Sequence, residues 1–470
     1  MTNSSLAHIA PIHILDDDSL LNVFYLYRPF LLGEDKDDNA RLAGGYKAWI
    51  GEHWWFKLAH ICQRWRNLIL GSRSYLGLCL VCTNNIAVAD ILAYSPPLPL
   101  ILEYLCEDSG IGTGDNGELM LALEQRERVH RIRLMISDRT SQKLITAMNG
   151  EFPILEYLII TSSSRAALIL PKRFQAPSLR QIVLIGPALP IRSQLFTATV
   201  GLVTLSLTMD YRSTYLPPTT LLQWLSCTPQ LETLRIFFAV PNYNVERKLT
   251  RMPITTQVTL PNLRWFVFQG VSAYSEGLFR WISSPRLEKF QIFLFPEFTF
   301  SIPYFVQFIN TTRNLRFSGA KFRFSNEQVH LAMYPREGNF TFWIVIICKH
   351  LELQVRFITQ IYSALSRIFS AVDHLALEHS QFFLEEDAVD SSEWHRLLRS
   401  FNNVKTLCFD DGLFKGLSRC LQPDNGVVPD LLPELQELTY AGYSNNDRVF
   451  TSFIDIRQNT GRPVTLVRRR

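Results

Sequence analysis

Residues 202–236 read LVTLSLTMDYRSTYLPPTTLLQWLSCTPQLETLRI, and this stretch decides the fold. It begins and ends with one phrase of the form L-x-x-L-x-L, first as LVTLSL from Leu202 and then as LETLRI from Leu231. The last two apolar positions of the phrase are two residues apart, so they share one face of a strand. Between the phrases, TTLLQWLS has helical spacing, with Thr219 or Thr220 as its candidate cap. The stretch therefore predicts a strand, a helix and a second strand.

The same phrase recurs along most of the chain. Successive lead residues are 23 residues apart at Leu179 and Leu202 and 32 apart at Leu231 and Leu263. The helical patterns GLFRWISS, ITQIYSALSRIFSA and SSEWHRLLRSF lie between later phrases, and the last has Ser391 or Ser392 as a candidate cap. A unit of this kind cannot bury its apolar face alone and must stack on its neighbours. The lead residues are Val129, Leu155, Leu179, Leu202, Leu231, Leu263, Leu287, Val372, Val404 and Leu435.

The period is close to that of leucine-rich repeats, whose units are ~20–29 residues long. We therefore expect an α/β fold, an irregular leucine-rich-repeat-like solenoid over residues 129–460, preceded by a small helical module. Residues 81–128 are expected to connect the two or to cap the array. The asparagine of regular repeats is missing, and between Leu287 and Val372 only NLRFSGAKFRF and FTFWIVIIC fill the space of about three units. We expect an irregular curve with long strands there.

The aromatic residues predict where such an array binds. The chain has Phe 32, Tyr 16 and Trp 9, and most of them fall inside the strand phrases, where they pack a core. Trp265 and Phe295 lie on the outward alternation and are candidates to face a groove. The concave strand face of a solenoid is the usual binding surface, so we expect an unidentified target protein to bind there.

Charge and apolar runs exclude several classes of partner. Lys+Arg 47 against Asp+Glu 43 gives a net charge of +4, which argues against a nucleic-acid-binding surface. Residues 461–470 end in three arginines and are expected to form a basic, solvated tail. The beginning of the chain has no secretory signal, and FTFWIVIIC is far short of the ~20 residues that cross a bilayer. These features predict a protein of the cytoplasm, the nucleus or both, with no membrane partner.

No motif in the chain predicts catalysis or a metal site. Cys79 and Cys82 form a C-x-x-C without a second pair, which favours core cysteines over a metal or redox site. His374 and His379 are five residues apart, on opposite faces of a strand, and so cannot share a metal. Residues 110–118, GIGTGDNGE, are glycine-rich but acidic, which indicates a loop. We expect no catalytic residue, no cofactor and no enzyme activity.

The N-terminal region lacks the repeat phrase, and its apolar residues have helical spacing. In ILDDDSLLNVFYLY, the aspartates from Asp16 onward favour a helix N-terminus, and Leu20, Val23 and Phe24 then share one helical face. An acidic, glycine-containing insert follows at about residues 31–47. Residues 54–70, WWFKLAHICQRWRNLIL, resume a helical pattern whose apolar stripe contains Leu58, Ile61, Cys62 and Trp65. We expect a helical module over residues 11–80.

This module resembles an F-box. Its opening and closing halves match the F-box pattern at Leu15, Leu20, Val23, Phe24, Leu58, Ile61, Cys62, Trp65 and Leu68, some of them by residue type only. The layout as a whole is similar to F-box proteins of basidiomycete fungi. The resemblance implies that these nine residues form a face that docks on a Skp-type adaptor of a cullin–RING ubiquitin ligase, while the repeats hold a substrate. Two departures stand out: Asp16 replaces the usual proline, and the insert between the halves is long.

Two questions stay open at this point. Leu20, Phe24, Ile61 and Trp65 either contact the adaptor or form the core of the module. We favour partner contact for Leu20 and Phe24 and weigh the two interpretations equally for Trp65. The chain as a whole is either a ubiquitin-ligase receptor or a repeat-based interaction scaffold with no ligase role. The missing proline and the long insert favour the scaffold.

Overall fold

A computed structural model describes most of the chain, and the chain divides into two compact units. Unit 1 comprises Met1–Ser164 and Leu170–Leu179, and unit 2 comprises Arg165–Ile169 and Arg180–Arg470. The insert at residues 31–47 and most of the glycine-rich segment at 110–118 lie outside the described residues. The structure describes residues 14–28, 54–83, 87–105, 117–136, 141–162, 168–187, 189–190, 193–209, 216–238, 257–295, 302–312, 314–315, 317–336, 341–379, 391–422, 431–441 and 450–469.

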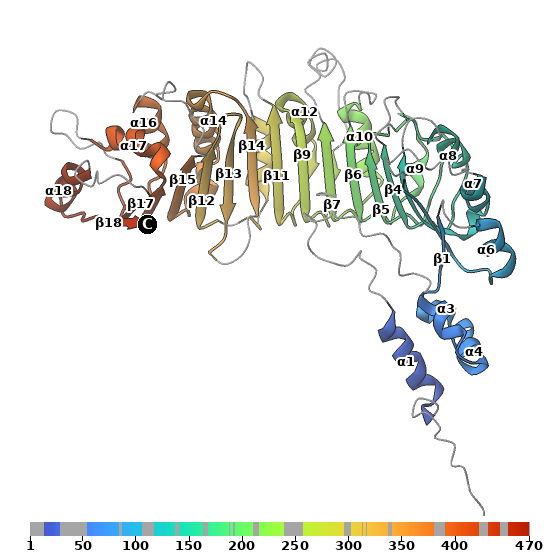
Figure 1. The fold of residues 1–470 in the computed structure, drawn as a ribbon. Coiled ribbons are helices and arrows are strands. Elements are labelled where there is room, and N and C mark those ends of the chain that lie inside the picture. Colours follow the sequence, from blue (N-terminus) through green and yellow to red (C-terminus); the bar gives the residue numbers. More distant parts are fainter. Residues whose placement is uncertain are drawn as a thin grey trace, which may run out of the picture. The chain divides into compact units, whose positions relative to one another are not determined.

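The described part of unit 1 contains four parallel strands, each paired with the next in chain order (Figure 1). Apolar side chains align across the register, as in the row Cys82, Leu102, Ile132 and Leu158, and all four are buried. The strands are β1 (Leu80–Thr83), β2 (Leu100–Leu105), β3 (Val129–Ile136) and β4 (Tyr157–Ser162). The helices between them are α6 (Val88–Tyr94), α7 (Gly117–Glu124), η2 (Arg126–Arg128) and α8 (Ser141–Ala147).

Residues 81–128 do more than connect the helical module to the array or cap the array. They contribute β2 and most of β1, and β2 pairs in parallel with the first predicted repeat strand, β3. The strand–helix pattern therefore begins near Leu80, before the start of the array that the repeat phrase predicts at Val129. The reason is that alternation in PLPLILEYL is enough to bury Leu98, Leu100 and Leu102, although this stretch lacks the repeat phrase.

The helical module of unit 1 consists of α1 (Asp17–Tyr27), α3 (Trp54–Ala59), α4 (Gln63–Gly71) and α5 (Arg73–Leu76). The single helix expected over residues 54–70 is interrupted at His60–Cys62. Cys62 has extended backbone angles and caps α4, since its Sγ accepts a hydrogen bond from the Trp65 backbone N–H at 3.5 Å. The side chain of Arg66 donates to the free carbonyl of Ala59 at 3.0 Å. These two contacts stabilise the break between α3 and α4.

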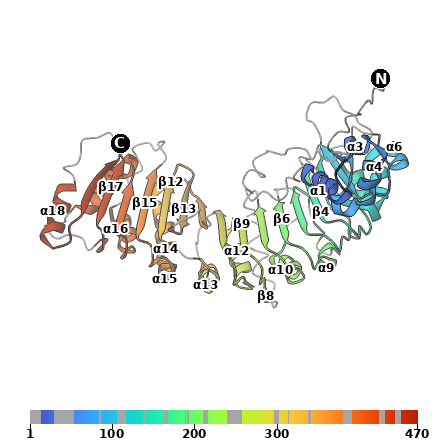
Figure 2. The same cartoon turned by 90° about the horizontal axis from the view of Figure 1, so that it is seen from below.

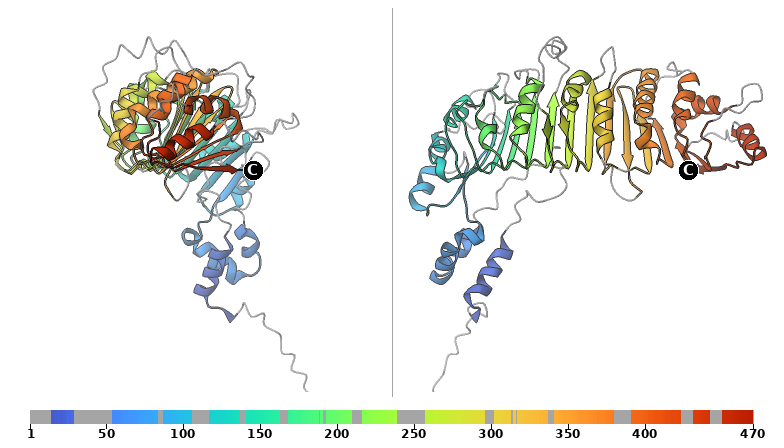
Figure 3. Two further views of the ribbon diagram at one scale, coloured as in Figure 1. Left: turned by 90° about the vertical axis from the view of Figure 1, so that its left-hand side faces the viewer. Right: turned by 180° about the vertical axis from the view of Figure 1, so that it is seen from behind.

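Unit 2 is a mixed α/β array around a predominantly parallel sheet. The strand order is β5-β6-β7-β9-β11-β14-β13-β12-β15-β16-β17-β18. The described helices α10, α12, α14 and α16 lie over one face of this sheet, and none of the described helices covers the middle of the other face (Figures 2 and 3). A short parallel pair, β8 (Val258–Thr259) with β10 (Ile282–Ser283), lies beside α10. No helix in the described part of the chain is long and apolar enough to cross a bilayer.

The remaining elements of unit 2 have the following bounds. The strands are β5 (Gln181–Ile185), β6 (Thr204–Met209), β7 (Thr233–Phe238), β9 (Trp265–Val271), β11 (Lys289–Phe295), β12 (Gly319–Phe324), β13 (Gln328–Tyr334), β14 (Phe342–Ile347), β15 (His374–His379), β16 (Thr406–Phe409), β17 (Glu437–Ala441) and β18 (Thr465–Arg469). The helices are α9 (Leu195–Ala198), α10 (Pro218–Ser226), α12 (Ser272–Phe279), α13 (Pro303–Thr311), α14 (Leu351–Ala364), α15 (Ser366–Phe369), α16 (Ser391–Arg399), η4 (Asp411–Leu413), α17 (Phe414–Leu421) and α18 (Thr451–Asn459).

The apolar positions of the repeat phrase occupy the same structural positions from one repeat to the next. Its middle position falls in one register row in unit 2, where Leu205, Leu234, Phe266 and Phe290 are aligned and buried. Its lead residue is buried in a tight turn just before the strand and donates its backbone N–H to the carbonyl three residues earlier. This bond is 3.2 Å long at Leu231, and it recurs at Leu155, Leu179, Leu202, Leu263, Leu287, Val372 and Leu435. The strands that the phrase predicted are confirmed.

The disturbed stretch is a three-stranded meander. NLRFSGAKFRF and FTFWIVIIC supply β12 and β14, and QVHLAMY supplies β13, which the repeat phrase did not predict. β13 is antiparallel to both neighbours, and β14 rather than β12 lies next to β11. The spatial order of the three strands is therefore the reverse of their order in the chain. No described helix lies directly before β13 or β14, so these two strands need no lead residue at a helix-to-strand turn, and the repeat phrase is absent from them.

Three local expectations need correction. α10 begins at Pro218, so Thr219 and Thr220 do not cap it; a proline at the first helical position lacks an N–H that would otherwise be unpaired. α12 ends at Phe279, and Ile282 belongs to β10 instead of a longer helix. The C-terminal segment is not a solvated tail, because β18 pairs in parallel with β17 and hydrogen-bonds to the backbone groups along its edge.

Candidate protein-interaction surfaces

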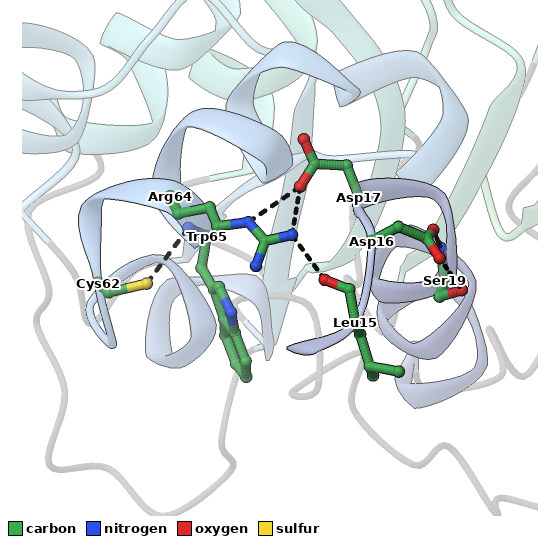
Figure 4. A network of polar contacts seen from close by, with 7 residues as sticks. All are labelled: Leu15, Asp16, Asp17, Ser19, Cys62, Arg64 and Trp65. Atoms are coloured by element: carbon green, nitrogen blue, oxygen red, sulfur yellow. Dashed lines mark hydrogen bonds and ion pairs between the residues drawn. The ribbon is translucent and has the colours of Figure 1, made fainter. Parts of the chain in front are cut away.

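The first helix of the module begins where the sequence placed its aspartates. Asp16 is the N-cap of α1, and its Oδ1 accepts a hydrogen bond from the Ser19 backbone N–H at 2.7 Å (Figure 4). The Ser19 hydroxyl donates to Oδ2 at 2.9 Å. The hydrogen bonds from Ser19 lower the pKa of Asp16, because they favour its charged form. An aspartate in place of the usual F-box proline therefore still starts the helix.

One arginine joins the two halves of the module. Arg64 of α4 donates to Oδ1 of Asp17 through Nη2 at 2.7 Å and through Nε at 3.0 Å. Its Nη2 also donates to the carbonyl of Leu15 at 2.7 Å (Figure 4). These atoms belong to segments 47 residues or more apart in the chain. The bridge fixes the start of α1 against α4, although exposed ion pairs of this kind each contribute only about 0–1 kcal/mol.

An apolar core lies beneath this bridge. The rings of Phe24 and Trp65 meet edge to face, with centroids 4.9 Å apart. Leu20 of α1, Ile69 of α4 and Leu76 of α5 are fully buried. The side chain of Trp55 is buried as well, and its Nε1 donates to the carbonyl of Cys79 at 3.3 Å. The module is therefore packed on itself and tied to the residues that lead into β1.

The nine residues of the expected docking face divide into three groups. Leu20, Phe24 and Trp65 are buried, so they form the core of the module, and Leu58, Cys62 and Leu68 are half-buried. Leu15, Val23 and Ile61 are exposed, with Ile61 at 55%. The structure adds large exposed apolar side chains that the resemblance did not name. They are Ile14, Tyr25, Leu26, Tyr27 and Tyr75.

Helical spacing is the signal that identifies part of this added surface. Val23, Leu26 and Tyr27 are three and four residues apart, so they lie on one face of α1. Leu26 is 80% exposed and Tyr27 is 60% exposed. We call these three residues together with Ile61 the module face.

A second candidate surface is the helix-free face of the unit 2 sheet. The side chain of Trp265 lies between two cations there, with the Arg235 guanidinium 4.1 Å and the Lys289 ammonium 5.3 Å from its ring centroid. Trp265 and Phe295 are both half-buried and both lie on this face, in agreement with their expected outward alternation. The chemistry of this part of the face is aromatic and positively charged, which suits recognition rather than catalysis.

Polar contacts continue along the same face into the meander. The Trp343 Nε1–H donates to Nδ1 of His330 at 3.3 Å, and burial together with the charge of Arg323 lowers the pKa of His330. Glu378 pairs with Lys321 at 2.5 Å and with Arg323 at 3.0 Å. Burial alone would raise the pKa of Glu378, but the hydrogen bonds from these two cations outweigh it and lower the pKa.

The candidate metal and redox residues lie apart from any shared site. Cys82 is buried in β1, and burial raises the pKa of its thiol to about 11, which makes the reactive thiolate scarce near neutral pH. His374 and His379 stand at opposite ends of β15, five residues apart and therefore on opposite faces. Among the described residues, no group of three or more His, Cys, Asp or Glu side chains is placed to hold a metal ion.

Comparisons with known proteins add little to this geometry. No protein-family model matches the chain, and no curated protein matches it. One solved structure with a similar trace is a "Crystal structure of TLR13-ssRNA13 complex", with 14% sequence identity and a TM-score of 0.33. The alignment covers 83% of this chain and 49% of that one, so this chain spans about half the length of the protein it matches.

Proposed function

We propose that the chain is the substrate receptor of a Skp–cullin–F-box type ubiquitin ligase, a binding protein and not an enzyme. In this proposal the module face docks on a Skp-type adaptor. The helix-free face of unit 2 binds the target protein, and the repeats form an irregular leucine-rich-repeat-like solenoid. Such a receptor would work in the cytoplasm, the nucleus or both.

One observation carries the proposal. Of the thirteen large apolar residues that are exposed in the described part of the chain, eight belong to residues 14–75, the helical module and its immediate start. Many exposed apolar side chains on a small helical element indicate a contact with another protein, because their exposure to water is unfavourable. The buried core of the module does not include these eight side chains, and all of them are exposed to solvent.

The resemblance names the partner, and the geometry is compatible with it. Phe24 and Trp65, which the resemblance assigns to different halves of the F-box pattern, pack together in the core. An amphipathic helix that presents residues three and four positions apart is a common recognition element for a helical partner. α1 presents Val23, Leu26 and Tyr27 in this way.

The second candidate function is a repeat-based interaction scaffold with no ligase role. It is favoured by the aspartate at position 16 and by the long insert between the two halves of the motif. It keeps the helix-free face as the binding surface and assigns the module face to some other protein.

A binding measurement with a purified Skp-type adaptor separates the two. Leu26→Asp and Ile61→Asp place a charge on the module face without touching the core, and we expect each to reduce the affinity by at least about tenfold. Tyr94→Asp is the matched control, because Tyr94 is 87% exposed in unit 1 and lies outside the module. Phe24→Asp is unsuitable, since it would unfold the module. A folded wild-type chain with no affinity for the adaptor would overturn the ligase proposal and leave the scaffold.

A further inference from the structure

A cavity of about 310 Å³ lies in unit 1 between the helical module and the first strands. Arg28, Trp54 and Arg73 line it from the module, and Ile101, His130 and Arg131 line it from β2 and β3. It is separate from the module face, because none of Val23, Leu26, Tyr27 and Ile61 lines it. Its size is at the lower end of the range for pockets that hold small molecules.

The polar lining of the cavity is cationic. Of the described residues, three arginines line it and no carboxylate does. Within the part of the chain that the structure describes, neither Arg28 nor Arg73 lies within ion-pair distance of an acidic side chain. Glu156 lies 3.4 Å from His130, which itself lines the cavity, and Glu103 pairs with Arg133 at 2.9 Å. Arg28 and Arg73 therefore bring positive charge to the cavity that no acidic side chain of the described residues pairs with.

Two of the arginines are held in place by aromatic rings. The Arg28 guanidinium lies 4.7 Å from the ring centroid of Tyr25, and the Arg131 guanidinium lies 4.5 Å from that of Tyr157. Stacking leaves the N–H edge of a guanidinium available and reduces the entropy that it loses when it binds an anion. Planar N–H donors of this kind match phosphate oxygens, and several of them lining one cavity favour a dianion over a monoanion.

Part of the remaining wall is apolar. The Trp54 indole and Ile101 line the cavity together with Leu78 and Pro99. A bare phosphate ion would leave this surface in contact with water, whereas a ligand with a compact apolar part would cover it.

We propose that this cavity binds a small, free phosphomonoester, with its phosphate held by Arg28, Arg73 and Arg131 and its apolar part against Trp54 and Ile101. Because the walls come from both the module and the strands, the ligand joins these two parts of unit 1. Binding therefore raises the unfolding temperature of the unit by linkage.

Calorimetric titration of the full chain with phenyl phosphate at low salt tests the site. We expect one phenyl phosphate per chain, bound more tightly than inorganic phosphate, and no binding of phenol. Arg28→Gln and Arg73→Gln should each weaken phenyl phosphate by about tenfold. Arg173→Gln is the matched control: Arg173 is an exposed arginine of the same unit that does not line the cavity, so its loss should leave the affinity unchanged.

Several results would overturn the assignment. One is a folded wild-type chain that does not bind phenyl phosphate at millimolar concentration. Another is an equal loss of affinity in Arg173→Gln, which would mean diffuse charge attraction. Because Arg73 is exposed, its variant should fold with an unchanged melting temperature, so undiminished binding by that variant would also overturn the site. A phosphotyrosine peptide that binds more tightly than phenyl phosphate would overturn the assignment to a free ligand.

Discussion

The rings of Phe24 and Trp65 meet edge to face at an interplanar angle of 64°, with their centroids 4.9 Å apart. The two residues are 41 positions apart in the sequence, on α1 and α4, and both are buried. This contact joins the two halves of the module across the long insert. It also means that neither ring can serve as a partner contact without unfolding the module, so the proposed adaptor would have to contact the side chains around them.

Replacement of Trp65 by alanine should destabilise the module by about 3–5 kcal/mol, because it removes a buried aromatic side chain and leaves a cavity. Chemical denaturation followed by circular dichroism measures the change. Tyr94→Ala is the control, and a change within about 0.5 kcal/mol is expected for it because Tyr94 is exposed. Equal losses in the two variants would contradict the packing of Trp65 against Phe24.

The buried ion pair between Glu103 and Arg133 offers a second test. The carboxylate Oε1 accepts from Arg133 Nη1 at 2.9 Å, and the two residues face each other across β2 and β3. Glu103→Gln should lower the free energy of unfolding by about 3–5 kcal/mol, because it removes the charge that faces a buried guanidinium. The double variant Glu103→Leu, Arg133→Met should recover most of this loss. A double variant less stable than the single one would show that the pair itself is strongly stabilising.

Glu276 should make stability depend on pH. Its Oε2 and Oε1 accept from the backbone N–H groups of Tyr304 and Phe305 at 2.8 and 2.9 Å, at the start of α13. Burial raises the pKa of Glu276 above its usual 4.5, and the two N–H bonds only partly offset this. The stability that this group contributes is therefore full below its unfolded pKa and is lost as pH rises through the raised, folded pKa.

The variant Glu276→Gln isolates this dependence, because the amide does not titrate. Urea denaturation of both proteins from roughly pH 4 to pH 8 measures the difference in unfolding free energy. We expect the variant to gain stability relative to the wild type as pH rises. A difference that stays constant, or that changes in the opposite direction, would contradict the raised pKa.

Gly319 should tolerate no side chain. An alanine Cβ at this position would overlap the ring of Tyr334, its partner across the antiparallel pair of β12 and β13. Gly319→Ala should therefore cost about 1–3 kcal/mol through overpacking, as measured by thermal or chemical denaturation. Gly201→Ala is the matched control, since no heavy atom lies within 4 Å of its added Cβ. Combining Gly319→Ala with Tyr334→Leu should restore part of the stability; no recovery would mean that the ring is not the obstacle.

The order of strand and helix in most of the array could be predicted from the sequence, because those features are encoded locally. Spacing of two residues marks a strand face, as at Leu205 and Leu207, and both side chains are indeed buried. The aspartate run likewise predicts the start of α1, where Asp16 satisfies backbone N–H groups within its own turn. Each of these signals depends on residues a few positions apart.

Other features were decided only by the tertiary structure, because they depend on partners that are distant in the chain. The antiparallel placement of β13 follows from its pairing with β12 and β14. The segment of β18 forms a strand because it pairs with the edge of β17. Which residues of the F-box-like motif are exposed depends on how Phe24 and Trp65 meet across the insert. The cationic cavity likewise exists only where the fold brings Arg28 and Arg73 to Arg131, since no local pattern links these residues.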